Sequence, residues 1–186
     1  MSAHARFSPS ASKRWLACPG SLVLNADHKD SGPSIYADNG TAMHAVAAWC
    51  LTEHRRASAR VGEMIPVHKD HEPARYVEFT DDMASQTQEY VDWLRAFAIG
   101  RTLRVEQAVD FSDIVGVPEQ FGTADGIVIG DGELTIADLK TGFRPVHAAG
   151  NTQLMTYALG ALHGLVADAV QEGTLHDSEL QDDDLF

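Results

Sequence analysis

One stretch of the chain combines acidic and basic residues with two apolar runs. Residues 122–142 read GTADGIVIGDGELTIADLKTG, so Asp125 precedes the first run, and Asp138 and Lys140 follow the second. Carboxylates bind divalent cations, and a neighbouring amine can orient or move a proton beside them. If the fold brings these three residues together, they form a candidate metal-dependent active site.

The dipeptide Asp131-Gly132 lies between the two apolar runs and predicts a two-residue hairpin. A type I′ turn needs positive φ at both central residues, which Asp-Gly tolerates well. This turn fixes which residues of the two strands face each other. The expected pairs are Ile129 with Leu134, Ile127 with Ile136, Asp125 with Asp138, and Thr123 with Lys140.

By the two-residue period of a strand, these eight residues share one face, apolar near the turn and ionic at its far end. Two carboxylates facing each other repel, so a divalent cation is expected between Asp125 and Asp138, and oxygen ligands favour Mg²⁺ or Mn²⁺. The alternative is a surface salt-bridge cluster in which Lys140 only neutralises the acids. The opposite face argues against that alternative, because it is also mostly apolar and ionic groups in a covered sheet are costly. Its residues are Ala124, Val128, Thr135, Ala137 and Leu139.

The rest of the sequence predicts elements that would position this hairpin. A fold of the α+β class is expected, with a small mixed central sheet flanked by helices. Residues 25–40 and 57–79 are interpreted as loops, the second with short extended pieces. The expected elements are helices over 12–17, from Gly40-Thr41 for about four turns, from a Thr80 cap and from an Asn151 cap, and strands over 102–111, 123–129 and 133–140.

Composition limits the possible classes of protein. At 186 residues and 44% hydrophobic residues the chain fits one soluble domain, expected over residues 1–167. Residues 168–186 are acidic, contain no Lys or Arg, and are expected to be a disordered tail. The net charge of −13 argues against a broadly basic nucleic-acid coat, but a local basic groove with bound cations remains compatible with it. No signal peptide or membrane span is expected, so the predicted location is the cytoplasm.

The hairpin residues and several motifs on either side of them resemble those of the PD-(D/E)XK nucleases, in their RecB-like and phage-exonuclease branch. The similarity rests on Asp125, on Asp138-Leu-Lys140 thirteen residues later, and on Gln153-x-x-x-Tyr157. Two upstream segments extend it, Gly40-Thr-Ala-Met-His44 and the segment 8–19 that ends in Cys-Pro. Each motif is weak alone, but five in the right order over about residues 8–160 are fairly specific.

The resemblance implies a restriction-endonuclease-like αβββα core and a bacterial or phage setting. The implied metal ligands are Asp125, Asp138, the Leu139 carbonyl and His44, with Mg²⁺ or Mn²⁺ as the cation. Lys140 would orient or deprotonate the attacking water, leaving a 5′-phosphate and a 3′-hydroxyl. DNA is the implied substrate. A single-strand annealing or binding protein and a homo-oligomer are further expected partners.

Other candidate residues have both a functional and an ordinary interpretation. Gln153 and Tyr157 share a helical face and would brace the site or touch the DNA backbone, but Tyr157 could equally be core. Glu106 is a further acid for the metal or a solvated strand residue, and His44 could simply be a packed helical residue. Three arginines after the His44 helix would bind phosphate or only face solvent. They are Arg55, Arg56 and Arg60.

The pattern departs from that branch in two places. Cys18 has no cysteine partners of the required spacing, so no iron–sulfur cluster is expected. Members usually continue past the Gln-x-x-x-Tyr helix into another strand and helix, so the C-terminal part of the core is expected to be missing. A catalytically weak DNA-binding or regulatory module, with the acidic tail mimicking DNA, is therefore the alternative function.

Overall fold

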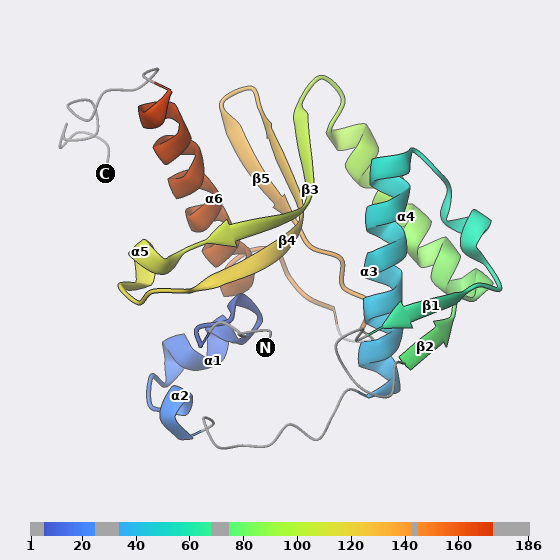
Figure 1. Cartoon of the computed structure of the whole chain (residues 1–186), viewed down its shortest axis with the longest axis horizontal. Coiled ribbons are helices and arrows are strands. Elements are labelled where there is room, and N and C mark those ends of the chain that lie inside the picture. The colour runs from blue at the N-terminus through green and yellow to red at the C-terminus, as the bar shows by residue number, and fades with distance from the viewer. Residues whose placement is uncertain (1–5, 25–33, 68–74, 143–144, 173–186) are drawn as a thin grey trace.

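Helices and strands alternate along the chain, and the computed structural model describes residues 6–24, 34–67, 75–142 and 145–172. The hairpin that carries the candidate site is its central feature (Figure 1). In chain order the elements are η1 (Pro9–Ala11), α1 (Ser12–Ala17), α2 (Ser21–Leu24), α3 (Ile35–Glu53), η2 (Ala57–Arg60), β1 (Met64–Val67), β2 (Arg75–Glu78), α4 (Asp81–Phe97), β3 (Thr102–Asp110), α5 (Ser112–Val115), β4 (Phe121–Gly130), β5 (Glu133–Ala137) and α6 (Thr152–Gln171).

The described strands form two small antiparallel sheets. β1 pairs with β2, and the central sheet has the order β3-β4-β5. The α+β class is confirmed, but the expected mixed sheet is wrong for the described residues. The reason is connectivity, because strands that follow each other through short links pair antiparallel, whereas a parallel neighbour needs a long crossover.

The predicted hairpin between β4 and β5 is confirmed at its turn and along most of its length. Asp131 and Gly132 have φ of 56° and 74°, the positive values of a type I′ turn. The register matches the prediction for Ile129 with Leu134 and for Ile127 with Ile136. Regular pairing stops at Gly126 with Ala137, however, so β5 ends before Asp138 and the strand predicted over 133–140 is too long.

The capping predictions hold for two of the long helices. Thr80 accepts a hydrogen bond from the Met83 backbone at the start of α4, and Asn151 caps α6. α3 begins at Ile35 rather than near Gly40, because the Ser34 hydroxyl accepts from the Ala37 backbone N–H and provides an earlier cap. Of the loop predicted over 25–40, residues 25–33 lie outside the described residues.

The region expected to be a loop with short extended pieces over 57–79 contains two short strands, β1 and β2, which pair with each other. The 3-10 helix η2 in the same region was not predicted, and residues 68–74 lie outside the described residues. At the other end of the chain, α6 continues past the boundary predicted at 167 and ends at Gln171. The remainder of the predicted tail, 173–186, lies outside the described residues.

Helices cover both faces of the central sheet (Figure 1). α6 packs on the face formed by Ile127, Ile129, Leu134 and Ile136, together with its own Tyr157. α3 and α4 pack on the other side, where Val105, Val128, Ala137 and Leu139 join the larger core cluster. Both faces are thus covered, as the sequence predicted. Within the described part of the chain, no helix has the length and apolarity that a bilayer span requires.

Candidate metal centre

Three acidic residues lie in one row across the central sheet. The last row in which all three strands pair, the last paired row, joins Val105 of β3 and Ala137 of β5 to Gly126 of β4. One residue beyond this row come Glu106 in β3, Asp125 in β4, and Asp138, which directly follows the end of β5. The sheet therefore brings together three carboxylates from segments that are well separated in the sequence.

The strands bend at this row. The β3–β4 ladder skips Glu106 and Asp125, and Glu106 has a φ of 49°, in the left-handed region that costs energy for a residue other than glycine. Both strands turn near their middle in the structure (Figure 1). One result differs from the prediction: Ala124 packs with Tyr157 on the α6 side instead of with Val128 on the other face. The bend ends the simple two-residue alternation on which that prediction depended.

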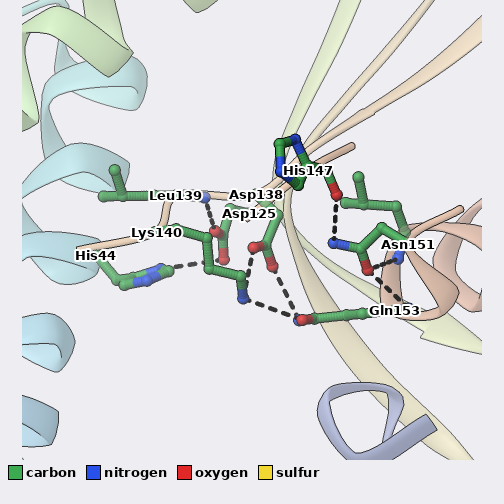
Figure 2. Close-up of polar contacts among 9 residues, drawn as sticks. His44, Asp125, Asp138, Leu139, Lys140, His147, Asn151 and Gln153 are labelled. Carbon is green, nitrogen blue, oxygen red and sulfur yellow. Dashed lines mark hydrogen bonds and ion pairs between the residues drawn. The ribbon is translucent and has the colours of Figure 1, made fainter. Parts of the chain in front are cut away.

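Asp125 connects the sheet to α3 and to the segment that follows β5. Its Oδ1 lies 3.1 Å from His44 Nδ1, and its Oδ2 accepts a hydrogen bond of 2.7 Å from the Leu139 backbone N–H. Figure 2 shows His44 reaching the carboxylate from α3. The Asp125 side chain is only 14% exposed, so these partners take the place of water around the carboxylate.

Asp138 belongs to a second, connected group with Lys140 and Gln153. Lys140 Nζ lies 2.6 Å from Asp138 Oδ2 and donates a 3.0 Å hydrogen bond to Gln153 Oε1. Gln153 Nε2 in turn donates to Asp138 Oδ1 at 2.9 Å, which closes a triangle of three side chains (Figure 2). The predicted neighbourhood of Asp125, Asp138 and Lys140 is therefore present. Its contacts are made by side chains and by the Leu139 N–H rather than by regular strand pairing.

The concentration of negative charge shifts the pKa values of the site residues. Burial lowers the pKa of His44, but its hydrogen bond to Asp125 and the charges of the three acids outweigh burial, so the pKa is raised. Burial is also the main reason that the pKa values of Asp138 and Glu106 are raised, and the charge of Asp125 adds to both shifts. Lys140 partly opposes the shift at Asp138. The cluster is therefore short of positive charge, which a cation would supply.

Three of the predicted ligands already lie within the span of one ion. One ligand atom from each of His44, Glu106 and Asp125 falls within 4.8 Å of the others. This nitrogen and oxygen donor set suits a first-row divalent cation such as Mn²⁺, and carboxylates suit Mg²⁺. Asp138, predicted as the second principal ligand, instead contacts Lys140 and Gln153. Glu106, which the sequence offered only as a further acid or a solvated strand residue, thus lies with His44 and Asp125 at the candidate metal position.

The start of α6 fixes Gln153. Asn151 Oδ1 accepts hydrogen bonds from the backbone N–H groups of Gln153 and Leu154, so the first turn is held in place. Tyr157, one turn later, is buried at 6% exposure. Burial raises its pKa, and a hydrogen bond with Gln153 partly opposes this shift. Tyr157 is therefore part of the core and also contacts Gln153, while its role at the site stays a prediction.

The N-terminal segment packs beside the site. Ser12 of α1 and Thr152 of α6 share a hydrogen bond of 2.7 Å between their hydroxyls. A cavity of about 620 Å³ lies between these elements, and both Lys13 and Lys140 line it. The sequence interpretation missed Lys13, although the motif over residues 8–19 contains it. Cys18 is exposed and Cys50 is buried, and both are free thiols.

The three arginines proposed for phosphate binding are not among these contacts. Arg60 pairs with Glu63 at 2.6 Å and stacks over the Trp49 ring. Arg55 and Arg56 follow the C-terminal end of α3, and Arg56 lines a separate cavity with Asp81 and other residues of α4. The structure therefore places this patch away from the carboxylate row.

A family model matches residues 4–169, which is most of the chain. The family is described as "Protein of unknown function (DUF2800)". No solved structure matches the chain.

Proposed function

The chain belongs to this family of unknown function, and from its site we propose that it is a metal-dependent DNA nuclease of the PD-(D/E)XK kind, acting as an exonuclease in recombination or DNA end processing. The observation that carries the proposal is the meeting of Asp125 and Asp138, one residue beyond the last paired row, with Lys140 held against Asp138. A surface salt-bridge cluster does not explain this arrangement well. The side chains of Asp125 and Asp138 are only 14% and 7% exposed, and burying charge without a task is costly.

The residues present fit a divalent cation. His44, Glu106 and Asp125 would hold it, and Asp138 and the Leu139 carbonyl are the further candidates that the resemblance implies. When bound, such a cation supplies an activated water and neutralises the charge that builds on a phosphate during hydrolysis. His44 binds a cation only as the neutral imidazole, so cation binding competes with the protonated form that pairs with Asp125.

Lys140 is the residue to which this proposal gives the most specific role. Its side chain is 40% exposed while its Nζ is held between Asp138 and Gln153, so the amine is both positioned and open to a substrate. An ammonium there can orient a water molecule or a phosphate oxygen. Gln153 fixes the carboxylate and the amine together, since one amide group contacts both.

DNA is a reasonable substrate despite the acidic composition. Lys13 and Lys140 line the same cavity beside the carboxylate row, which gives a phosphate a local positive surface. A bound cation would add to this surface, and it would also reverse the field of the acids. The net charge of −13 then describes the whole chain and not the site.

The proposal is tested by incubating linear and circular DNA with the protein and Mn²⁺. Wild type is expected to degrade DNA, and a preference for linear DNA would support exonuclease action. Lys140→Ala is expected to lower the rate by roughly 10²-fold or more, the scale of losing a group that acts in the transition state. Arg101→Ala is the matched control, because Arg101 also pairs with an aspartate, Asp131, but at the hairpin turn.

The outcomes separate the candidate functions. Cleavage that survives Lys140→Ala, or no cleavage and no DNA binding by wild type, contradicts the nuclease proposal. DNA binding without cleavage in Mn²⁺ supports the regulatory module instead. A form that ends after Glu172 keeps α6 whole and tests the acidic tail, because cleavage by this form alone would show that the tail is inhibitory.

A further inference from the structure

Tyr90 of α4 has a buried hydroxyl that the proposed chemistry leaves unused. Its Oη makes no hydrogen bond with any residue that the structure describes. A buried donor without a partner is costly, and phenylalanine would fill the same space without that cost. A hydroxyl at this place is therefore informative about what lies beside it.

The position of Tyr90 follows from Gly126. A methyl group at Gly126 would lie 3.3 Å from Tyr90 Oη and 2.8 Å from Leu94 Cδ2, so the missing side chain lets α4 approach the sheet closely. Gly126 belongs to the last paired row, directly before the three acids. The hydroxyl thus lies over the row that adjoins the carboxylates.

The hydroxyl lies within the electrostatic field of the three carboxylates. Burial is the main cause that raises the pKa of Tyr90, and the charges of Asp125, Asp138 and Glu106 raise it further, with Asp125 the strongest of the three. The phenol therefore keeps its proton and is available as a donor toward the acids.

Asp125 has room for such a donor. Its Oδ1 contacts His44, and its Oδ2 accepts a hydrogen bond from the Leu139 N–H. A carboxylate can accept about four hydrogen bonds, so a further donor can join these two contacts.

We propose that Tyr90 is a positioning residue, which donates a hydrogen bond to the Asp125 carboxylate when that carboxylate binds a divalent cation. This inference rests on the proposed function, since it concerns the same metal site. Hydrogen bonds to ligating carboxylates orient them, and the loss of one typically weakens metal binding about 10- to 100-fold.

The test compares Mn²⁺ binding by wild type and Tyr90→Phe in titration calorimetry, together with the Tm of each metal-free protein. The expected result is roughly 10- to 100-fold weaker Mn²⁺ binding by Tyr90→Phe, with an unchanged or higher metal-free Tm. The matched control is Thr87→Val, because Thr87 carries the other buried α4 hydroxyl that lacks a hydrogen bond among the described residues. This control should leave Mn²⁺ affinity unchanged.

Several results would overturn the inference. Equal Mn²⁺ affinity for wild type and Tyr90→Phe removes it while leaving the proposed metal site intact. A lower metal-free Tm with unchanged affinity shows that the hydroxyl is structural. An equal loss of affinity in Thr87→Val shows that α4 packing, and not the hydroxyl, controls the site. If wild type binds no Mn²⁺, the proposed function itself fails, and this inference fails with it.

Discussion

The backbone N–H of Leu139 donates a hydrogen bond of 2.7 Å to Asp125 Oδ2, across the point where regular pairing of β4 and β5 has ended. The side chain of Asp125 thus replaces a backbone carbonyl as the acceptor. This contact holds the segment after β5 in place, and with it the neighbouring Asp138 and Lys140. One acid therefore has a structural role toward the segment and a chemical role toward a cation.

These two roles of Asp125 can be separated by substitution. Asp125→Ala leaves the buried Leu139 N–H without its acceptor and should lower the free energy of unfolding by about 1–3 kcal/mol. Asp125→Asn keeps an acceptor oxygen and should cost clearly less. Both variants should lose Mn²⁺ binding, since neither provides a carboxylate. Urea unfolding and calorimetry measure the two effects, and equal stability of the two variants would contradict the structural role.

His44 should make metal-free stability depend on pH. Its pKa in the folded protein is raised above the ordinary value of 6.5, so its pairing with Asp125 stabilises the fold fully below about pH 6.5. This contribution is lost as the pH rises through the raised pKa. Thermal melts from about pH 6 to 9 should show wild type losing its advantage over His44→Gln. A difference in Tm that stays constant over this range would refute the assignment.

The same group should give Mn²⁺ binding the opposite pH dependence. His44 must release a proton before it can bind the ion, so affinity should rise with pH by up to about tenfold per unit until His44 is neutral. Titrations of His44→Gln should show weaker binding and a flatter dependence over the same pH range. An identical slope in both proteins would mean that His44 is not a ligand.

Glu106 offers a direct comparison between stability and function. It lies beside Asp125 in a cluster with excess negative charge. Burial is the main cause that raises the pKa of Glu106, and the charge of Asp125 raises it further. Glu106→Gln removes that repulsion and should raise the metal-free Tm slightly, by about 2 °C, while it weakens Mn²⁺ binding. Differential scanning calorimetry with and without Mn²⁺ measures both. Lower metal-free stability would show that the carboxylate has a structural partner instead.

The local features of the fold could be predicted from sequence because they depend on local chemistry. The turn at Asp131-Gly132, the Thr80 and Asn151 caps and the apolar pairs of the hairpin follow from backbone preferences and from the strand period. The end of β5 could not be predicted in this way. It depends on the hydrogen bond from the Leu139 N–H to the Asp125 side chain, which is a tertiary contact.

The candidate site shows the same division. Pairing rules placed Asp125 near Asp138, and the spacing of Gln153 and Tyr157 predicted a shared helical face. The sequence left open whether Glu106 faces the metal position or solvent, because its placement depends on the bend at a residue of positive φ. Lys13 and Tyr90 approach the site only through helix packing, for which the sequence carries no short-range signal.

Two glycines of α6, one helical turn apart, should respond in opposite ways to the same substitution. A methyl group at Gly160 would lie 2.5 Å from Val109 Cγ1 and 2.9 Å from the Asp110 carbonyl oxygen, whereas one at Gly164 meets nothing within 4 Å. Gly160→Ala should therefore destabilise the protein by about 1–3 kcal/mol through overpacking. Gly164→Ala should stabilise it by about 0.5–1 kcal/mol, because alanine favours the helix.

The close contact at Gly160 also matters for the site, because α6 carries Gln153 against Asp138 and Lys140. If Gly160→Ala moves α6 away from β3, Mn²⁺-dependent cleavage should fall well below that of wild type even at temperatures where the variant is fully folded. Gly164→Ala should keep wild-type cleavage. Urea unfolding and the DNA assay, run on both variants, test this link, and full activity in a folded Gly160→Ala protein would show that the position of α6 does not control the site.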